Sequence, residues 1–92
     1  MSEYIEIEHE PGDDPDLMYI YTNVRLAEGP PEQYRSTAEM EEGSPVAQAI
    51  AYVEGIQELR LQEKTMTVRR EQEMPWHIIV AEISTAIKEF FL

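Results

Sequence analysis

The chain has no cysteine among its 92 residues. This absence excludes disulfide bonds, thiolate nucleophiles, zinc–thiolate sites and iron–sulfur clusters held by cysteines of the chain itself. Basic residues are also scarce, with seven lysines and arginines against 19 aspartates and glutamates. Nucleic acids and anionic membrane surfaces are bound through basic patches, so the composition argues against both as partners.

Long apolar runs are absent too, and the acidic N-terminus lacks the basic start of a targeting segment. The four glycines, at positions 12, 29, 43 and 55, form no phosphate-binding loop. No internal repeat or low-complexity tract is present. We therefore expect a single domain over residues 1–92 that is cytoplasmic, monomeric and without a cofactor.

What the chain does have is acidity combined with a substantial apolar fraction. Its formal net charge is −12 at pH 7, and 42% of its residues are hydrophobic. The apolar fraction indicates a folded domain rather than a disordered acidic tail. The charge either steers the domain towards a basic protein partner or simply forms a well-solvated acidic surface.

The first secondary-structure signal in the second half of the chain is a helix. Ser44 is a favourable N-cap, Pro45 suits the first helical position, and Gly55 can end the element in a left-handed conformation. Between them, apolar residues recur with helical spacing at Val46, Ala49, Ile50 and Val53.

A hairpin and a final helix follow. Alternating apolar residues predict two strands joined by a turn at 62–64: Ile56, Leu59 and Leu61 before the turn, and Met66 and Val68 after it. Pro75 then starts a helix. The apolar stripe predicted for this helix is Trp76, Ile79, Val80, Ile83, Ile87 and Phe90.

The first half of the chain predicts strands. Residues 4–9 alternate strictly, with Ile5 and Ile7 on one face, which His9 continues towards the rim of the core. Residues 10–16 form a loop, 17–26 a long strand and 34–38 a short third strand. The expected fold is α+β, in ββ(β)αββα order, with an antiparallel or mixed sheet of four to five strands and two helices on one face.

The loop at 10–16 and the residue before it hold the densest group of potential metal ligands. The candidates are His9, Glu10, Asp13, Asp14 and Asp16. Carboxylate oxygens suit calcium, magnesium or manganese, whereas a histidine shifts the preference towards iron or zinc. Aspartates beside prolines are also common in solvated turns, which is the simpler interpretation. No catalytic residue is predicted, since neither histidine has an evident partner in a triad or metal pair.

The few basic residues concentrate on or beside the predicted hairpin, at Arg60, Lys64, Arg69 and Arg70. Cross-strand pairing with glutamates such as Glu63 and Glu71 is the favoured interpretation. The alternative is a bipolar protein whose acidic loop and basic hairpin contact different partners. Exposed tyrosines could add a protein-binding patch or simply line the rim of the sheet, and the candidates are Tyr19, Tyr21, Tyr34 and Tyr52.

Several of these segments together resemble the N-terminal domain of Nfu/NifU-type iron–sulfur scaffold proteins. The matching segments are 44–49 (SPVAQA), 53–56 (VEGI), 66–69 (MTVR) and Trp76 at the head of the final helix. In the family, an Asn-containing signature lies between the first two strands; here Asp14 and Asp16 replace its asparagines and Tyr19 its basic residue. The resemblance implies an accessory domain, since the family holds its cluster in a separate Cys-X-X-Cys domain.

The leading hypothesis is therefore a non-catalytic accessory domain that assists iron–sulfur cluster assembly or delivery in trans. Its partner would be a scaffold, a carrier or an apo-target protein. The predicted contact residues are Pro11, Asp14, Pro15, Asp16, Ser44 and Pro45. The alternatives are an unrelated protein-binding or regulatory module on the same fold, and a weak iron or divalent-metal binding protein.

Overall fold

The structure of the chain is a computed structural model that describes residues 5–92. Its strands are β1 (Ile7–Pro11), β2 (Leu17–Thr22), β3 (Glu32–Tyr34), β4 (Ile56–Gln62) and β5 (Thr65–Arg70). Its helices are α1 (Thr37–Glu41), α2 (Pro45–Ile50) and α3 (Trp76–Phe91). The order of the elements is the predicted one, with the short helix α1 in addition.

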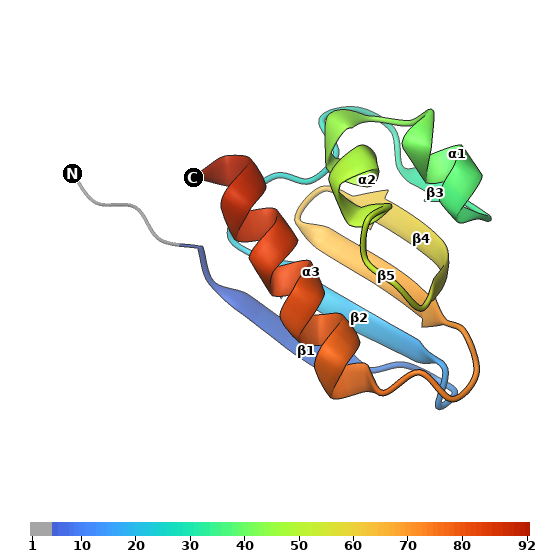
Figure 1. The fold of residues 1–92 in the computed structure, drawn as a ribbon. Helices are drawn as coiled ribbons and strands as arrows, with labels where there is room; N and C mark the ends of the chain where they lie inside the picture. Colours follow the sequence, from blue (N-terminus) through green and yellow to red (C-terminus); the bar gives the residue numbers. More distant parts are fainter. Residues whose placement is uncertain (1–4) are drawn as a thin grey trace.

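The strands form one five-stranded sheet in the order β1-β2-β5-β4-β3, and every neighbouring pair is antiparallel. Figure 1 shows α3 lying across the β1–β2 side of the sheet, with α1 and α2 towards β4 and β3. All three helices cover the same face. The predicted α+β fold with its helices on one face is therefore confirmed, and the sheet is purely antiparallel.

The core lies between the sheet and the helices. Strand residues that point towards the helices are buried, among them Met18, Ile20, Leu59, Leu61, Met66 and Val68. From α3, the residues Ile79, Ile83 and Ile87 are each at most 1% exposed. These isoleucines are four positions apart and therefore form one stripe along the helix.

The opposite face of the sheet carries polar and aromatic side chains. The strand register aligns Glu10, Tyr19, Thr67 and Arg60 across β1, β2, β5 and β4. None of these four is buried. An antiparallel sheet can leave one face in water, so this face needs no cover. Among residues 5–92, no helix combines the length and the apolar character needed to cross a membrane.

Helix α2 starts as predicted. The Ser44 hydroxyl oxygen accepts a hydrogen bond from the Ala47 N–H at 3.3 Å, and Pro45 is the first helical residue. The helix ends at Ile50, earlier than the apolar stripe predicts, and a turn leads to Gly55. Gly55 has a φ of +91°, a left-handed conformation that favours glycine.

Strand β1 is displaced along the chain from its predicted position. It covers Ile7–Pro11 instead of 4–9, so Glu10 and Pro11 pair with β2 rather than belonging to the loop. Tyr4 lies outside the described residues. His9 is exposed rather than at the rim of the core, because β1 is the edge strand of the sheet.

Strand β2 ends at Thr22, whereas the sequence predicts a strand as far as position 26. The Thr22 hydroxyl donates a hydrogen bond to the Val24 carbonyl at 2.8 Å, a local bond that turns the backbone out of the strand. Leu26 and Ala27 are buried, and their N–H groups donate to the Glu63 carbonyl at 2.6 Å and 3.2 Å. Leu26 is therefore a core residue in a loop that packs against the hairpin turn.

The predicted strand at 34–38 is wrong for most of its length. Only Tyr34 belongs to β3, and α1 begins at Thr37. The Ser36 hydroxyl accepts from the Glu39 N–H at 3.2 Å, and the Glu39 carboxylate accepts from the Arg35 N–H at 2.8 Å. The Ser-X-X-Glu spacing of residues 36–39 is the sequence signal for this helix start.

The apolar stripe of α3 differs from the prediction at its C-terminal end. Phe90 is 43% exposed, so its assignment to the core is wrong. Phe91 packs against the core instead. The reason is helical geometry, since Phe91 continues the four-residue spacing of Ile83 and Ile87 whereas Phe90 falls short of it.

Candidate functional site

The loop between β1 and β2, which contains the predicted contact and metal-ligand residues, is closed by hydrogen bonds of its own. The Gly12 N–H donates to the Leu17 carbonyl at 2.8 Å, and the Leu17 N–H donates to the Asp14 carbonyl at 3.1 Å. The Asp14 carboxylate accepts from the Asp16 N–H at 2.8 Å. An aspartate that accepts from the backbone two residues later stabilises a turn, which explains the residue type at position 14.

Arg70, the last residue of β5, fixes this loop to the helical side of the sheet. Its Nε donates to Asp16 Oδ1 at 3.0 Å, and its Nη1 donates to the Met74 carbonyl at 2.8 Å. The guanidinium carbon also lies 5.2 Å from the centre of the Trp76 ring. The Arg70 side chain is only 21% exposed, so its charge interactions are less screened than those at the open surface.

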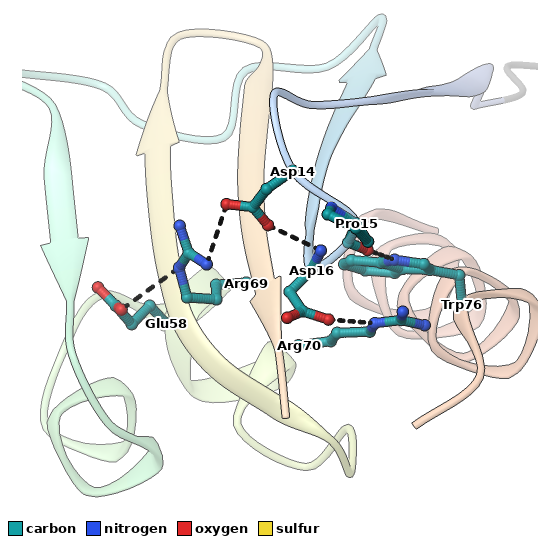
Figure 2. Close-up of polar contacts among 7 residues, drawn as sticks. All are labelled: Asp14, Pro15, Asp16, Glu58, Arg69, Arg70 and Trp76. Atoms are coloured by element: carbon teal, nitrogen blue, oxygen red, sulfur yellow. Dashed lines mark hydrogen bonds and ion pairs between the residues drawn. The ribbon is translucent and has the colours of Figure 1, made fainter. Parts of the chain in front are cut away.

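Arg69 reaches the same loop from the open face of the sheet, because successive strand residues point to opposite faces. Its guanidinium nitrogens lie 3.4 Å from Asp14 Oδ2 and 3.6 Å from Glu58 Oε2. Asp14 and Glu58 are 45% and 40% exposed, so each pair contributes little to stability. Figure 2 shows the two arginines holding opposite sides of the loop.

Trp76, the first residue of α3, completes the attachment of the loop. Its indole Nε1 donates a hydrogen bond to the Pro15 carbonyl at 2.7 Å (Figure 2). The ring is half-buried and packs against the edge of the core. Residues from β5 and α3 therefore bind the loop through both polar and aromatic contacts.

These contacts bear on two expectations about charge. Arg69 pairs across the strands with a glutamate, as the favoured interpretation predicts, but the partner is Glu58. The picture of a bipolar protein is wrong for Arg69 and Arg70, because their guanidinium groups also bind the acidic loop instead of facing a different partner. Two of the chain's few basic residues thus hold one loop in place.

The predicted metal ligands are not gathered into one site. His9 and Glu10 are exposed on β1, whereas Asp14 and Asp16 face arginines. A neighbouring guanidinium group opposes the binding of a second cation to the same carboxylate. Throughout residues 5–92, no group of three histidine, aspartate or glutamate side chains is placed to hold a metal ion.

Glu10 instead interacts with Tyr21 on the open face of the sheet. The Tyr21 hydroxyl donates to Glu10 Oε1 at 3.3 Å. The pKa of the Tyr21 phenol is raised above its usual value of 10.0, first by desolvation and then by the negative charge of Glu10. The nearby carboxylate disfavours the ionised phenolate, so Tyr21 stays neutral across the physiological range.

Ser44 and Pro45, the other predicted contact residues, lie near the C-terminal end of α3, far from the loop. They line a hollow with Phe90 and Phe91. The Ser44 N–H donates to the Tyr34 hydroxyl at 3.2 Å, and the Ser44 hydroxyl caps α2. The polar groups of Ser44 are thus engaged inside the molecule, and the exposed part of this helix start is the ring of Pro45.

Comparison with known proteins identifies the family. The family model described as the N-terminal part of the scaffold protein Nfu/NifU matches residues 7–92. The chain belongs to this family. No curated protein sequence matches it.

Two solved structures share the fold of this Nfu/NifU N-terminal domain. One is the solution NMR structure of a NifU-like protein from Saccharomyces cerevisiae, with a TM-score of 0.77 and 15% identity over 97% of this chain and 82% of that one. The other is the crystal structure of protein SAV1430 from Staphylococcus aureus, with a TM-score of 0.71 and 15% identity over 87% and 94% of the two chains. At this level of identity the likeness shows the fold alone.

Family membership relates the domain to iron–sulfur scaffold proteins. The residues of this Nfu-type domain do not fit a bound cluster, because the sequence has no cysteine and residues 5–92 hold no group of metal-ligating side chains.

Sequence reasoning missed the contacts of Trp76 and the exposed position of Phe90. A tryptophan directly after a proline at a helix start carried the first signal, since an indole N–H usually finds a partner when it is partly buried. The signal for Phe90 was its position directly before Phe91, because only one of two consecutive helical residues can continue the core stripe. The pairing of Arg69 and Arg70 with the loop had no sequence signal, because it depends on the alignment of β2 with β5.

Proposed function

We propose that this domain is a non-catalytic accessory unit that binds a protein partner in trans during iron–sulfur cluster assembly or delivery. The partner is a scaffold, a carrier or an apo-target protein that supplies the cysteine ligands. The observation that carries this proposal is the Nfu/NifU N-terminal match over residues 7–92 in a sequence without cysteine.

The chemistry of the described residues supports a binding role over catalysis. Within the loop at 12–16, Asp14 and Asp16 pair with arginines, and Asp14 also accepts a backbone hydrogen bond, which suits a structural role. A general acid or base requires a pKa close to the working pH and a free path to substrate. The large negative charge favours fast encounter with a basic protein surface.

The predicted contact residues lie in two separate places in the fold. The loop at 11–16 is attached to Trp76, whereas Ser44 and Pro45 lie beside Phe90. Helix α3 separates these ends by about 22 Å, given its rise per residue. A partner that touches both must span the length of α3, and a smaller partner binds at one end.

The test is an amide NMR titration. A cysteine-bearing Nfu-type domain from the same organism is added to labelled domain, first in its apo form and then loaded with its cluster. We expect saturable shifts that localise to one or both ends of α3. A scaffold domain mutated at both cysteines is the control for contacts that depend on the cluster.

The absence of any shift at high partner concentration would contradict binding to this class of scaffold. Shifts spread evenly over acidic residues and abolished by moderate salt would show electrostatic association without a specific surface. Iron–sulfur absorbance that stays with the purified domain itself would overturn the assignment of the cluster to the partner.

A further inference from the structure

The outer surface between α2 and the end of α3 contains a hollow lined by both apolar and polar residues. Pro45, Ala49, Tyr52 and Phe90 contribute to its lining, and the charged residue in its wall is Glu41. Phe90 is 43% exposed here, although its neighbour Phe91 is packed on the core. Large apolar side chains that remain exposed side by side mark sites of association more often than isolated ones do.

A second hollow lies on the other side of Tyr52, towards the start of β4. Its lining includes Gly55, Met74 and the carboxylates of Glu54 and Glu71. Among the described residues that line the two hollows, all the charged ones are glutamates. On the open sheet face, one hollow contains Arg60 and Arg69 beside Glu58, and another is lined by Glu6, Glu8 and Tyr21.

Tyr52 forms the ridge between these hollows and is 88% exposed. Its backbone is nevertheless well held, because the Ala51 N–H donates to the Ala47 carbonyl and the Val53 N–H donates to the Ile50 carbonyl, each at 2.9 Å. Within residues 5–92 the Tyr52 hydroxyl has no hydrogen-bond partner. A fixed backbone that presents an aromatic ring to solvent is the arrangement found at binding hot spots, where tyrosine is enriched.

We propose that this surface, the Tyr52 face, docks a basic amphipathic segment of a partner protein. An apolar side chain of the segment enters the hollow beside Phe90, and arginine or lysine side chains meet Glu41, Glu54 and Glu71. A guanidinium group can also lie over the Tyr52 ring, since cations are attracted to the faces of aromatic rings. The proposal rests on the proposed function in one respect, namely that the domain acts by binding protein.

The negative charge of the domain favours a basic segment as the partner that binds the Tyr52 face. The domain carries a net charge of −12, so a second copy or an acidic segment would be repelled. A basic segment would meet Arg60 and Arg69 at one hollow of the open sheet face, whereas the charged residues lining the Tyr52 face are all glutamates. Pro45 from the sequence prediction belongs to this face, whereas the loop at 11–16 does not.

The probe for the test is a synthetic helical peptide with leucines on one side and arginines on the other. We expect saturable amide shifts centred on residues 45–56 and 86–92 of the labelled domain. The same peptide with glutamate in place of arginine should cause none. Tyr52→Ala should weaken the arginine peptide about tenfold, while Tyr52→Phe retains affinity because it keeps the ring.

Tyr21→Ala is the matched control, because Tyr21 is also an exposed tyrosine beside glutamates but lies on the opposite face of the sheet. Its removal should leave peptide affinity unchanged. The Tyr52 face would be overturned as a site if Tyr21→Ala and Tyr52→Ala lost peptide affinity equally. It would also be overturned if the amide shifts were spread over acidic residues across the whole surface.

The two proposals can fail separately. If the cysteine-bearing scaffold domain binds and Tyr52→Ala leaves its affinity unchanged, the accessory function stands and the Tyr52 face is rejected as its contact surface. If the arginine peptide binds at the Tyr52 face while the scaffold domain does not bind, the surface stands and the link to cluster assembly is rejected. Circular dichroism of Tyr52→Ala confirms that any loss is not due to unfolding, since the side chain is exposed.

Discussion

The two ends of α3 use aromatic residues in opposite ways. At its N-terminal end, Trp76 is hydrogen-bonded to Pro15 and covered by the Arg70 guanidinium group. At its C-terminal end, Phe90 is exposed beside the almost bare ring of Tyr52. At the first end the charged groups pair with one another, whereas the second end exposes two aromatic rings beside the Glu41 side chain. The densest group of charged residues in the sequence therefore forms an attached loop, whereas the surface proposed for docking lies at the other end of α3.

The comparison is tested most strongly by truncating the two aromatic residues. Trp76→Ala should lower the free energy of unfolding by about 3 kcal/mol, because it removes packing and leaves the Pro15 carbonyl without its donor. Phe90→Ala should cost about 1 kcal/mol or less, since much of its ring is already in water. Urea unfolding followed by circular dichroism measures both. Similar losses in the two variants would show that the ends of α3 do not differ as described.

The second test compares two arginines of the hairpin. Arg70→Gln removes the ion pair to Asp16, the bond to the Met74 carbonyl and the contact with Trp76, so we expect a loss of about 2 kcal/mol. Arg60→Gln, on the exposed part of β4, should change stability by less than about 0.5 kcal/mol. Thermal unfolding at low and high salt separates them. A loss in Arg70→Gln that vanishes in high salt would mean that only the charge matters.

A finer test uses the adjacent aspartates of the loop. Asp14→Ala should destabilise the domain by about 1 kcal/mol, because the Asp16 N–H loses its acceptor. Asp14→Asn should recover most of this loss, since the amide oxygen can still accept. Asp13→Ala is the control, as its side chain is exposed and removes the same charge. If all three variants were equally stable, the turn would not depend on the side chain at position 14.

The smallest expected effect concerns Tyr21. Its phenol pKa is raised above 10.0 in the folded domain, so its contribution to stability is present below the unfolded value and is lost as the pH rises through the folded value. Glu10→Gln should move the pKa back towards 10.0, as followed by NMR of carbon-labelled tyrosine. Glu8→Gln makes the same charge change next to Tyr21 on β1 and should shift the pKa less. A larger effect from Glu8→Gln would contradict the assigned cause.

Much of the fold follows from local sequence patterns. The Ser44 cap, the hairpin around 62–64 and the restart of a helix at Pro75 each depend on neighbouring residues only, and all three are confirmed. The errors occur where distant contacts decide the outcome. Leu26 is ordered by the Glu63 carbonyl, and β1 is shifted by its pairing with β2. Helix α1 is the exception, since its capping signal at 36–39 is local.

The candidate surfaces were less accessible to sequence reasoning. Asp14 lies beside Arg69, and Tyr52 lies beside Phe90, although the members of each pair are far apart in the sequence. Only the completed sheet and the helices packed on it bring each pair together. Residue type predicted a charged site because carboxylates are common ligands. Whether a carboxylate binds a ligand or stabilises the fold depends on which side chains lie beside it in the structure.

The order of the strands in the sheet also determines which strands can pair while the chain is still being synthesised. The β1–β2 hairpin can form early, but Met18 lies opposite Val68, so the inner edge of β2 stays unpaired until β5 has been synthesised. An exposed strand edge readily pairs with other chains. The row of carboxylates at Glu6, Glu8 and Glu10 accompanies that hairpin from the start. We expect the repulsion between these carboxylates on neighbouring nascent chains to keep the unfinished sheet from aggregating.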